Sequence, residues 1–224
     1  HFHTHDTSGT SSASVLAAID AGVEIVDLAM DSMSGSTSQP SMGSILSIIK
    51  NKNEIPLNLD DINKTSLYWE QVRQNYTAFE SNFKGGDSEV YFHQMPGGQF
   101  TNLKEQARSL GISSDKWGKI SAMYASVNKM FGDIIKVTPS SKVVGDMALY
   151  MITNDLSPQD VLDPDKEISF PESVIEFFKG ELGTPLGGFP EKLQKKILGN
   201  LEPMKDRPGA VLPLVDLKIL KKKL

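Results

Sequence analysis

The sequence predicts a small α/β unit followed by a mostly helical region. Over residues 1–50, short runs with the character of strands alternate with segments whose apolar side chains recur at helical spacing, which is the pattern of a parallel βα repeat. From residue 51 onward, apolar side chains recur only at helical spacing, and no further convincing strand is found. The rest of the chain is therefore expected to consist of helices and their connections.

The chain opens on a predicted βα pair. In HFHTH (residues 1–5) the histidines occupy alternate positions, so they point to one face of a strand. A turn then leads into a helix that begins at Ser11 and ends before Gly22. The helix is predicted because three apolar side chains share one of its faces: Val15, Leu16 and Ile19.

A second βα pair follows. The run EIVDLAM (residues 24–30) is nearly continuous in apolar residues, which is typical of a strand covered on both faces. A polar loop rich in glycine and serine, DSMSGSTSQPS, occupies residues 31–41. The next helix is predicted from the i, i+3, i+4, i+7 spacing of Met42, Ile45, Leu46 and Ile49.

Helical stripes dominate the remaining sequence. Two further helices are predicted over residues 171–182 and 191–198, and a short basic helix over residues 216–224. The three clearest stripes have apolar side chains three or four residues apart: Trp69, Val72, Tyr76 and Phe79; Ile120, Met123, Tyr124, Val127 and Met130; Val143, Val144, Met147 and Met151.

The composition is that of an ordinary globular protein. The 224 residues are 39% hydrophobic and 23% charged, and the formal net charge of -5 argues against a nucleic-acid partner. No apolar run approaches the length of a membrane span, so no membrane partner is expected. The absence of cysteine excludes disulfides and cysteine metal ligands from this sequence. Because the chain begins with His inside a predicted strand, we expect a fragment of a longer protein.

The alternating histidines are candidate metal ligands. Residues two apart on a strand share a face, so His3 and His5 can reach one metal ion. His1 shares this face, but functional sites in parallel α/β folds lie at the carboxyl ends of the strands, which favours His5 and then His3. The alternative is that all three are polar residues at a strand edge. Two ligands do not complete a site, so carboxylates, waters or groups outside this chain would have to supply the rest.

A second unusual stretch is KVTPSSKVVGD. Pro139 suits the first position of a helix, so Thr138 is predicted to be its N-cap. A helix N-terminus that carries Ser140, Ser141 and Lys142 suits anions and polar ureido or carboxylate groups. The two interpretations are compatible, because a rigidly held hydroxyl can also relay a proton.

The glycine-rich segment HQMPGGQFTNL (residues 93–103) is not a phosphate-binding loop. It lacks the Lys-Ser or Lys-Thr pair that follows the glycines of a Walker-type turn. We therefore expect a tight turn that leads into a helix around Leu103.

Several of these segments resemble one family, the carboxyltransferase domain of pyruvate carboxylase. The resemblance keeps one order along the chain, covers nearly all of it, and extends through residues 169–193. The segments that carry it are HTHDTSG (residues 3–9), DSMSGSTSQPS (residues 31–41), MPGGQFTNL (residues 95–103) and VTPSSKVVGD (residues 137–146).

The resemblance implies the fold in more detail. Residues 1–55 would be the last two βα units of a TIM (β/α)8 barrel. Residues 56–200 would form a helical funnel subdomain. Residues 201–224 would begin the linker domain that binds an allosteric activator.

The resemblance also implies the site. His3 and His5 would hold a divalent metal, zinc or manganese, together with an Asp and a carbamylated lysine that are not in this chain. Thr138 would be the catalytic hydroxyl that relays a proton. Ser141 and Lys142 would line the biotin pocket.

The implied activity is the carboxyltransferase half-reaction, in which CO2 moves from carboxybiotin to pyruvate and gives oxaloacetate. Biotin would be carried on a separate carrier domain, and ATP, Mg2+ and acetyl-CoA would act at other domains of a multifunctional ligase. The family implies a homo-oligomer, tetrameric with a dimeric contact through this domain, in the bacterial cytoplasm or the animal mitochondrial matrix. The alternatives are a biotin-dependent oxaloacetate decarboxylase or transcarboxylase subunit, or a non-catalytic dimerising fragment. The chain by itself is expected to be inactive.

Overall fold

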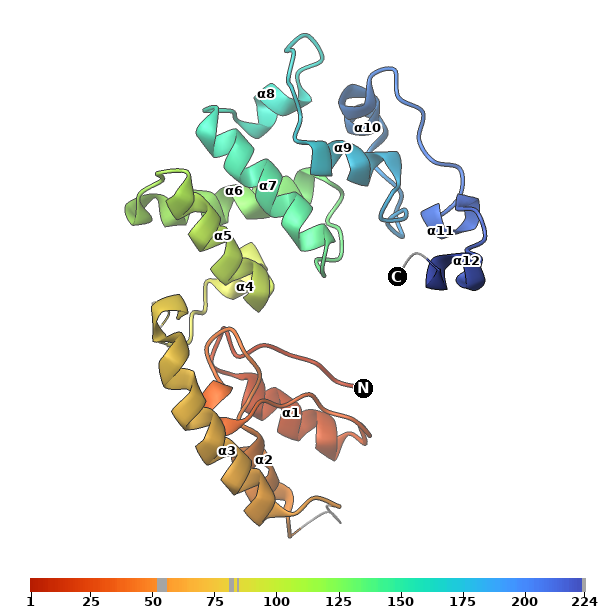
Figure 1. The fold of residues 1–224 in the computed structure, drawn as a ribbon. Coiled ribbons are helices and arrows are strands. Elements are labelled where there is room, and N and C mark those ends of the chain that lie inside the picture. Colours follow the sequence, from red (N-terminus) through yellow and green to blue (C-terminus); the bar gives the residue numbers. More distant parts are fainter. Residues whose placement is uncertain (52–55, 81–82, 84, 223–224) are drawn as a thin grey trace. The chain divides into compact units, whose positions relative to one another are not determined.

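The computed structural model describes residues 1–51, 56–80, 83 and 85–222, and these are mostly helical (Figure 1). The chain divides into two compact units, His1–Trp117 and Gly118–Leu224, which are described separately. The boundary that the sequence predicts between residues 55 and 56 adjoins positions 52–55, which lie outside the described residues.

The first unit begins with extended segments in place of continuous strands. Phe2 pairs with Val26 and Ala29 with Ser41, each as an isolated parallel bridge. The first bridge is made by two backbone hydrogen bonds, Phe2 N–H to Ile25 O at 2.8 Å and Asp27 N–H to Phe2 O at 3.1 Å. The predicted parallel pairing is therefore present, but among the described residues it extends over single bridges, too short for a strand.

Short helices connect these segments. They are α1 (Ser11–Asp20), the 3-10 helix η1 (Asp31–Met33) and α2 (Met42–Ile49). The Ser41 hydroxyl caps α2 by accepting the Ser44 N–H at 3.2 Å, and Ile45 and Leu46 on its predicted apolar face are buried.

The remainder of the first unit is helical. Its elements are α3 (Leu59–Arg73), η2 (Gln74–Phe79), α4 (Val90–His93), α5 (Gly97–Ser109) and η3 (Ser114–Lys116). The α3 helix packs against α2 and η1. The stripe predicted from Trp69 to Phe79 is interrupted, because α3 ends at Arg73 and a 3-10 turn follows. Tyr76 is 56% exposed and Phe79 83% exposed, so these rings are outside the core.

The second unit is built on the stripes that the sequence predicts. Its elements are α6 (Trp117–Met130, which begins at the last residue of the first unit), α7 (Ser140–Thr153), α8 (Pro158–Leu162), α9 (Glu172–Lys179), α10 (Glu191–Leu198), α11 (Pro208–Val211) and α12 (Leu217–Lys221). The α9 helix packs against both α7 and α10. The predicted apolar positions Ile120, Tyr124, Val127, Val143, Val144, Met147 and Met151 are all buried.

Aromatic side chains complete this core. Phe131 meets Phe178 edge to face with ring centroids 4.9 Å apart, and Phe177 meets Phe189 in the same way at 5.2 Å. This cluster ties the end of α6 to α9. Among the described residues, no helix combines the length and the apolar character needed to cross a membrane.

Candidate functional site

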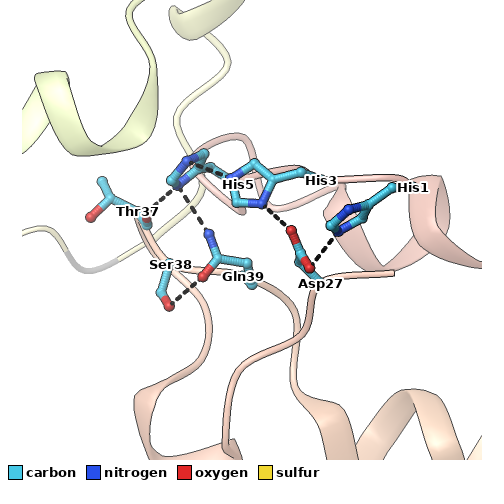
Figure 2. A network of polar contacts seen from close by, with 7 residues as sticks. All are labelled: His1, His3, His5, Asp27, Thr37, Ser38 and Gln39. Carbon is cyan, nitrogen blue, oxygen red and sulfur yellow. Dashed lines mark hydrogen bonds and ion pairs between the residues drawn. The ribbon is translucent and has the colours of Figure 1, made fainter. Parts of the chain in front are cut away.

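The side chains of His3 and His5 come together at their Nε2 atoms. Both residues lie on the extended segment before α1, two positions apart, so both point to one side of the backbone. The two Nε2 atoms are 3.3 Å apart, and the rings meet edge to face with centroids 5.0 Å apart. Figure 2 shows the imidazoles beside the loop that carries Thr37 and Gln39.

Asp27 fixes the tautomer of His3. Its Oδ2 accepts a hydrogen bond from His3 Nδ1 at 2.7 Å, and its Oδ1 accepts one from His1 Nε2 at 2.7 Å. Because an ionised carboxylate can only accept, His3 Nδ1 carries a proton and a neutral His3 keeps a free lone pair on Nε2. The same argument places a proton on His1 Nε2, so that nitrogen donates to Asp27 and has no free lone pair for a metal.

The backbone carbonyl of Thr37 fixes the tautomer of His5. His5 Nδ1 lies 2.6 Å from Thr37 O. A carbonyl oxygen can only accept, so Nδ1 donates and a neutral His5 also keeps its lone pair on Nε2. The amide nitrogen of Gln39 lies 3.4 Å from the same Nδ1, but both groups are then donors, so the shorter contact with Thr37 decides the tautomer.

These two lone pairs form half of a metal site. Two unprotonated nitrogens cannot share a hydrogen bond, whereas a cation between them satisfies both. Zinc–nitrogen bonds of about 2.0–2.1 Å at a tetrahedral angle place two ligands about 3.3–3.4 Å apart, which matches the observed separation. Among the described residues, no group of three or more histidines, aspartates or glutamates is arranged to hold a metal. His3 and His5 therefore fit a metal as two of its ligands, and the described residues do not supply the others.

Asp6 holds the turn that follows the histidines. Its Oδ1 accepts the backbone N–H of Ser11 at 3.0 Å and also the Ser11 hydroxyl, so a carboxylate occupies the N-terminus of α1. Its own N–H donates to Ser38 O at 2.8 Å. The sequence HDTSG thus turns sharply because Asp6 joins the start of α1 to the loop of Thr37, and this keeps His5 beside that loop.

Thr138 does not cap a helix, contrary to the prediction. The α7 helix begins at Ser140, and Pro139 occupies its N-cap position. The Ser140 hydroxyl, not that of Thr138, hydrogen-bonds to the backbone before the helix. It accepts the Val137 N–H at 3.1 Å and lies 2.8 Å from Ile135 O. Thr138 is exposed and lies one residue before the cap, so its hydroxyl is not used to start the helix.

Ser141 and Lys142 occupy different environments in the first turn of α7. Ser141 is buried, and its carbonyl accepts the Tyr124 hydroxyl at 3.3 Å, where burial raises the pKa of the phenol. Lys142 is exposed, and its Nζ lies 2.5 Å from Asp146 Oδ2. The same oxygen accepts the Ser173 hydroxyl at 2.6 Å, so Asp146 fixes the direction of the Lys142 side chain.

Sequence reasoning missed Asp27 and Thr37. Asp27 had a detectable signal, because it is an acidic residue inside an otherwise apolar run. Thr37 had none, because it acts through its backbone carbonyl and any residue type supplies that group. The glycine-rich segment is a turn into α5, as predicted, with Pro96 at the N-cap.

Comparison with known proteins places the chain in a family. A family model described as the conserved carboxylase domain matches residues 90–224. The chain is 49% identical over 222 residues to the pyruvate carboxylase of Bacillus subtilis, covering 99% of this chain and 19% of that protein. It is 48% identical over 229 residues to the mitochondrial pyruvate carboxylase of Rattus norvegicus, covering 100% of this chain and 19% of that protein. The chain thus spans about a fifth of these relatives.

Solved structures agree with this assignment. The carboxyl transferase domain from Rhizobium etli pyruvate carboxylase, solved with oxamate and biotin, is 56% identical and aligns with a TM-score of 0.93, covering 100% of this chain and 38% of that one. The same domain solved with pyruvate and biocytin aligns equally well, at a TM-score of 0.93 and 56% identity, and 37% of it is covered. From the family model, the relatives and the shared fold together, the chain belongs to the conserved carboxylase domain family of pyruvate carboxylases.

Proposed function

We propose that this chain is the carboxyl-end part of the carboxyltransferase domain of a pyruvate carboxylase, a biotin- and ATP-dependent ligase. Its half-reaction moves CO2 from carboxybiotin to the methyl carbon of pyruvate and gives oxaloacetate. The observation that carries the proposal is the convergence of His3 Nε2 and His5 Nε2 at 3.3 Å with both lone pairs free. The Rhizobium etli domain, whose structure contains pyruvate and biocytin, supports the choice of substrates.

The domain organisation follows from this assignment. Residues 1–55 are proposed to be the last two βα units of a TIM barrel, and the parallel bridges of Phe2 and Ala29 are consistent with that origin. Residues 56–200 form the helical funnel subdomain, and residues 201–224 begin the linker domain.

His3 and His5 are proposed to hold a divalent metal, zinc or manganese, through Nε2. An Asp and a carbamylated lysine from outside this chain complete the ligand set. When bound, such a metal polarises a ketoacid carbonyl and so makes the neighbouring methyl group more acidic. The contribution of this chain is to hold both imidazoles in the correct tautomer, through Asp27 and Thr37 O.

Thr138 is proposed to be the catalytic proton relay. During carboxylation the pyruvate methyl carbon loses a proton and gains a bond to CO2, and that proton must reach biotin. A hydroxyl serves this purpose because it accepts one proton as it donates another. Thr138 is suited to it because its hydroxyl is exposed and is not used as a helix cap.

Ser141 and Lys142 are proposed to bind biotin. The exposed Lys142 ammonium, held by Asp146, can donate to the oxygen of a ureido group. The remaining partners lie elsewhere in the proposed enzyme: a carrier domain for biotin, sites for ATP, Mg2+ and acetyl-CoA, and further copies of the chain in a tetramer. The compartment is the cytoplasm in a bacterium and the mitochondrial matrix in an animal.

Histidine variants of the full-length enzyme test the proposal. His3→Ala and His5→Ala are each expected to lose bound metal and oxaloacetate formation while they retain ATP cleavage at the separate biotin carboxylase domain. His1→Ala is the matched control, and it should keep its metal because His1 Nε2 bonds to Asp27. A His5→Ala enzyme that keeps both its metal and its carboxylation rate would refute the assignment.

A further inference from the structure

We propose that Gly97 is a positioning residue for His5. The absence of a side chain at Gly97 lets the first turn of α5 lie directly against the imidazole and the Thr37 carbonyl. The helix then holds the ring in the orientation in which Nδ1 donates to Thr37 O and Nε2 faces His3.

The close approach is measured by what a Cβ at position 97 would meet. That atom would lie 2.7 Å from His5 Nδ1, 2.9 Å from His5 Cγ and 2.8 Å from Thr37 O. All three separations are shorter than normal van der Waals contact, and one of the atoms belongs to the backbone. A side chain at this position would therefore displace the ring, the loop or the helix.

The backbone does not otherwise require glycine here. Positive φ angles occur at several other glycines among the described residues, but Gly97 is not one of them. It lies in the first turn of α5, and glycine inside a helix costs about 1 kcal/mol relative to alanine. At the neighbouring Gly98, a Cβ would meet no atom within 4 Å, so the need for space is specific to Gly97.

The start of α5 is anchored by buried side chains. Met95 and Phe100, on either side of the turn, are fully buried. The Met95 N–H also donates to the Nδ1 of the buried His93 at 3.0 Å, which fixes the chain just before the helix. The His5 ring therefore lies between the start of α5 and the carbonyl with which it bonds.

The consequence for metal binding rests on the proposed function. Changes to groups that orient a metal-bound histidine typically weaken metal binding about 10–100-fold. In the full-length enzyme, Gly97→Ala should weaken Co2+ binding in a chelator competition by about that factor and shift the visible spectrum of the bound Co2+. Gly98→Ala is the matched control. It should leave the affinity and the spectrum near wild type and should not lower the melting temperature, because it replaces a glycine inside a helix with alanine.

A crystal structure of the metal-free Gly97→Ala enzyme tests the positioning role of Gly97 separately from the proposed metal binding by His5. The positioning role predicts that the 2.6 Å contact between His5 Nδ1 and Thr37 O is broken. The positioning role would be overturned if the Gly97→Ala enzyme retained this contact, or if it bound Co2+ as tightly as Gly98→Ala does. If His5→Ala does not weaken Co2+ binding, the metal assignment fails while the crystal structure still decides the role of Gly97. If Gly97→Ala does not fold, the double variant His5→Ala/Gly97→Ala should, since two of the three close atoms are removed; a double variant that also fails to fold would contradict the proposal.

Discussion

Removal of the Asp27 carboxylate should weaken metal binding without unfolding the protein. Asp27→Ala deletes the acceptor for His3 Nδ1, so the ring is free to move its proton to Nε2, and that tautomer cannot bind a metal through Nε2. Loss of such a partner typically costs about 10–100-fold in metal affinity. His3 is 53% exposed and Asp27 39% exposed, so water can replace part of the lost hydrogen bond. We therefore expect a loss near the lower limit, about tenfold, or roughly 1.4 kcal/mol.

The assay is a chelator competition for Zn2+ or Co2+ on the full-length enzyme, with the melting temperature measured in parallel. His1→Ala is the control, since it removes the other partner of Asp27 but leaves the His3 bond in place. The account expects a weaker metal site in Asp27→Ala and a nearly unchanged one in His1→Ala. An Asp27→Ala enzyme with wild-type metal affinity and an unchanged melting temperature would refute the argument that Asp27 sets the His3 tautomer.

Three further outcomes are expected. Thr138→Ala should fold and bind metal yet lose at least about a hundredfold in oxaloacetate formation, whereas Thr138→Ser should keep substantial activity; equal rates for the two variants would exclude a relay. Asp146→Asn should raise the KM for free biotin in a carboxyl-transfer assay, because Lys142 loses its ion-pair partner, and an unchanged KM would contradict a biotin-binding Lys142 held by Asp146. His93 is buried, and desolvation lowers its pKa despite Asp87 and Glu89, which raise it, while Lys104 lowers it further. The unfolded chain therefore binds a proton on His93 more readily than the folded protein does. The contribution of His93 to the stability of the fold should be fully present above about pH 6.5 and should be lost as the pH falls below it. Melting temperatures measured between pH 8 and 5 check this, and those of His93→Gln should depend less on pH.

The sequence predicts the helices well because their signals are local. The spacing of Met42, Ile45, Leu46 and Ile49 predicts α2, and the segment 191–198 coincides with α10. The buried stripe of α7 also follows from spacing alone. In each case the apolar face that the pattern defines is the face that the protein buries.

The features that the sequence does not predict depend on long-range or backbone contacts. The bond between His3 and Asp27 joins residues 24 positions apart, and the bond between His5 and Thr37 O joins residues 32 apart. No local pattern encodes either pairing. Thr138 is misplaced as a cap because the Ser140 hydroxyl folds back onto the preceding loop and the helix starts one residue later than the position of Pro139 suggests. The stripe predicted from Trp69 to Phe79 fails for two reasons. The α3 helix buries none of its residues, Trp69 being 37% exposed, and at Gln74 it gives way to a 3-10 helix, which carries Tyr76 and Phe79 and which the periodicity does not reveal.

The central claim is that His3 and His5 bind one metal through Nε2 in the working enzyme. The most direct measurement is the X-ray absorption spectrum at the metal edge of the purified full-length enzyme, compared with that of His5→Ala. The account predicts scattering from two imidazole rings, at about 2.0–2.1 Å if the metal is zinc, and from one ring in any metal retained by the variant. A metal whose spectrum contains no imidazole scattering, or one whose spectrum is identical in His5→Ala, would contradict the claim.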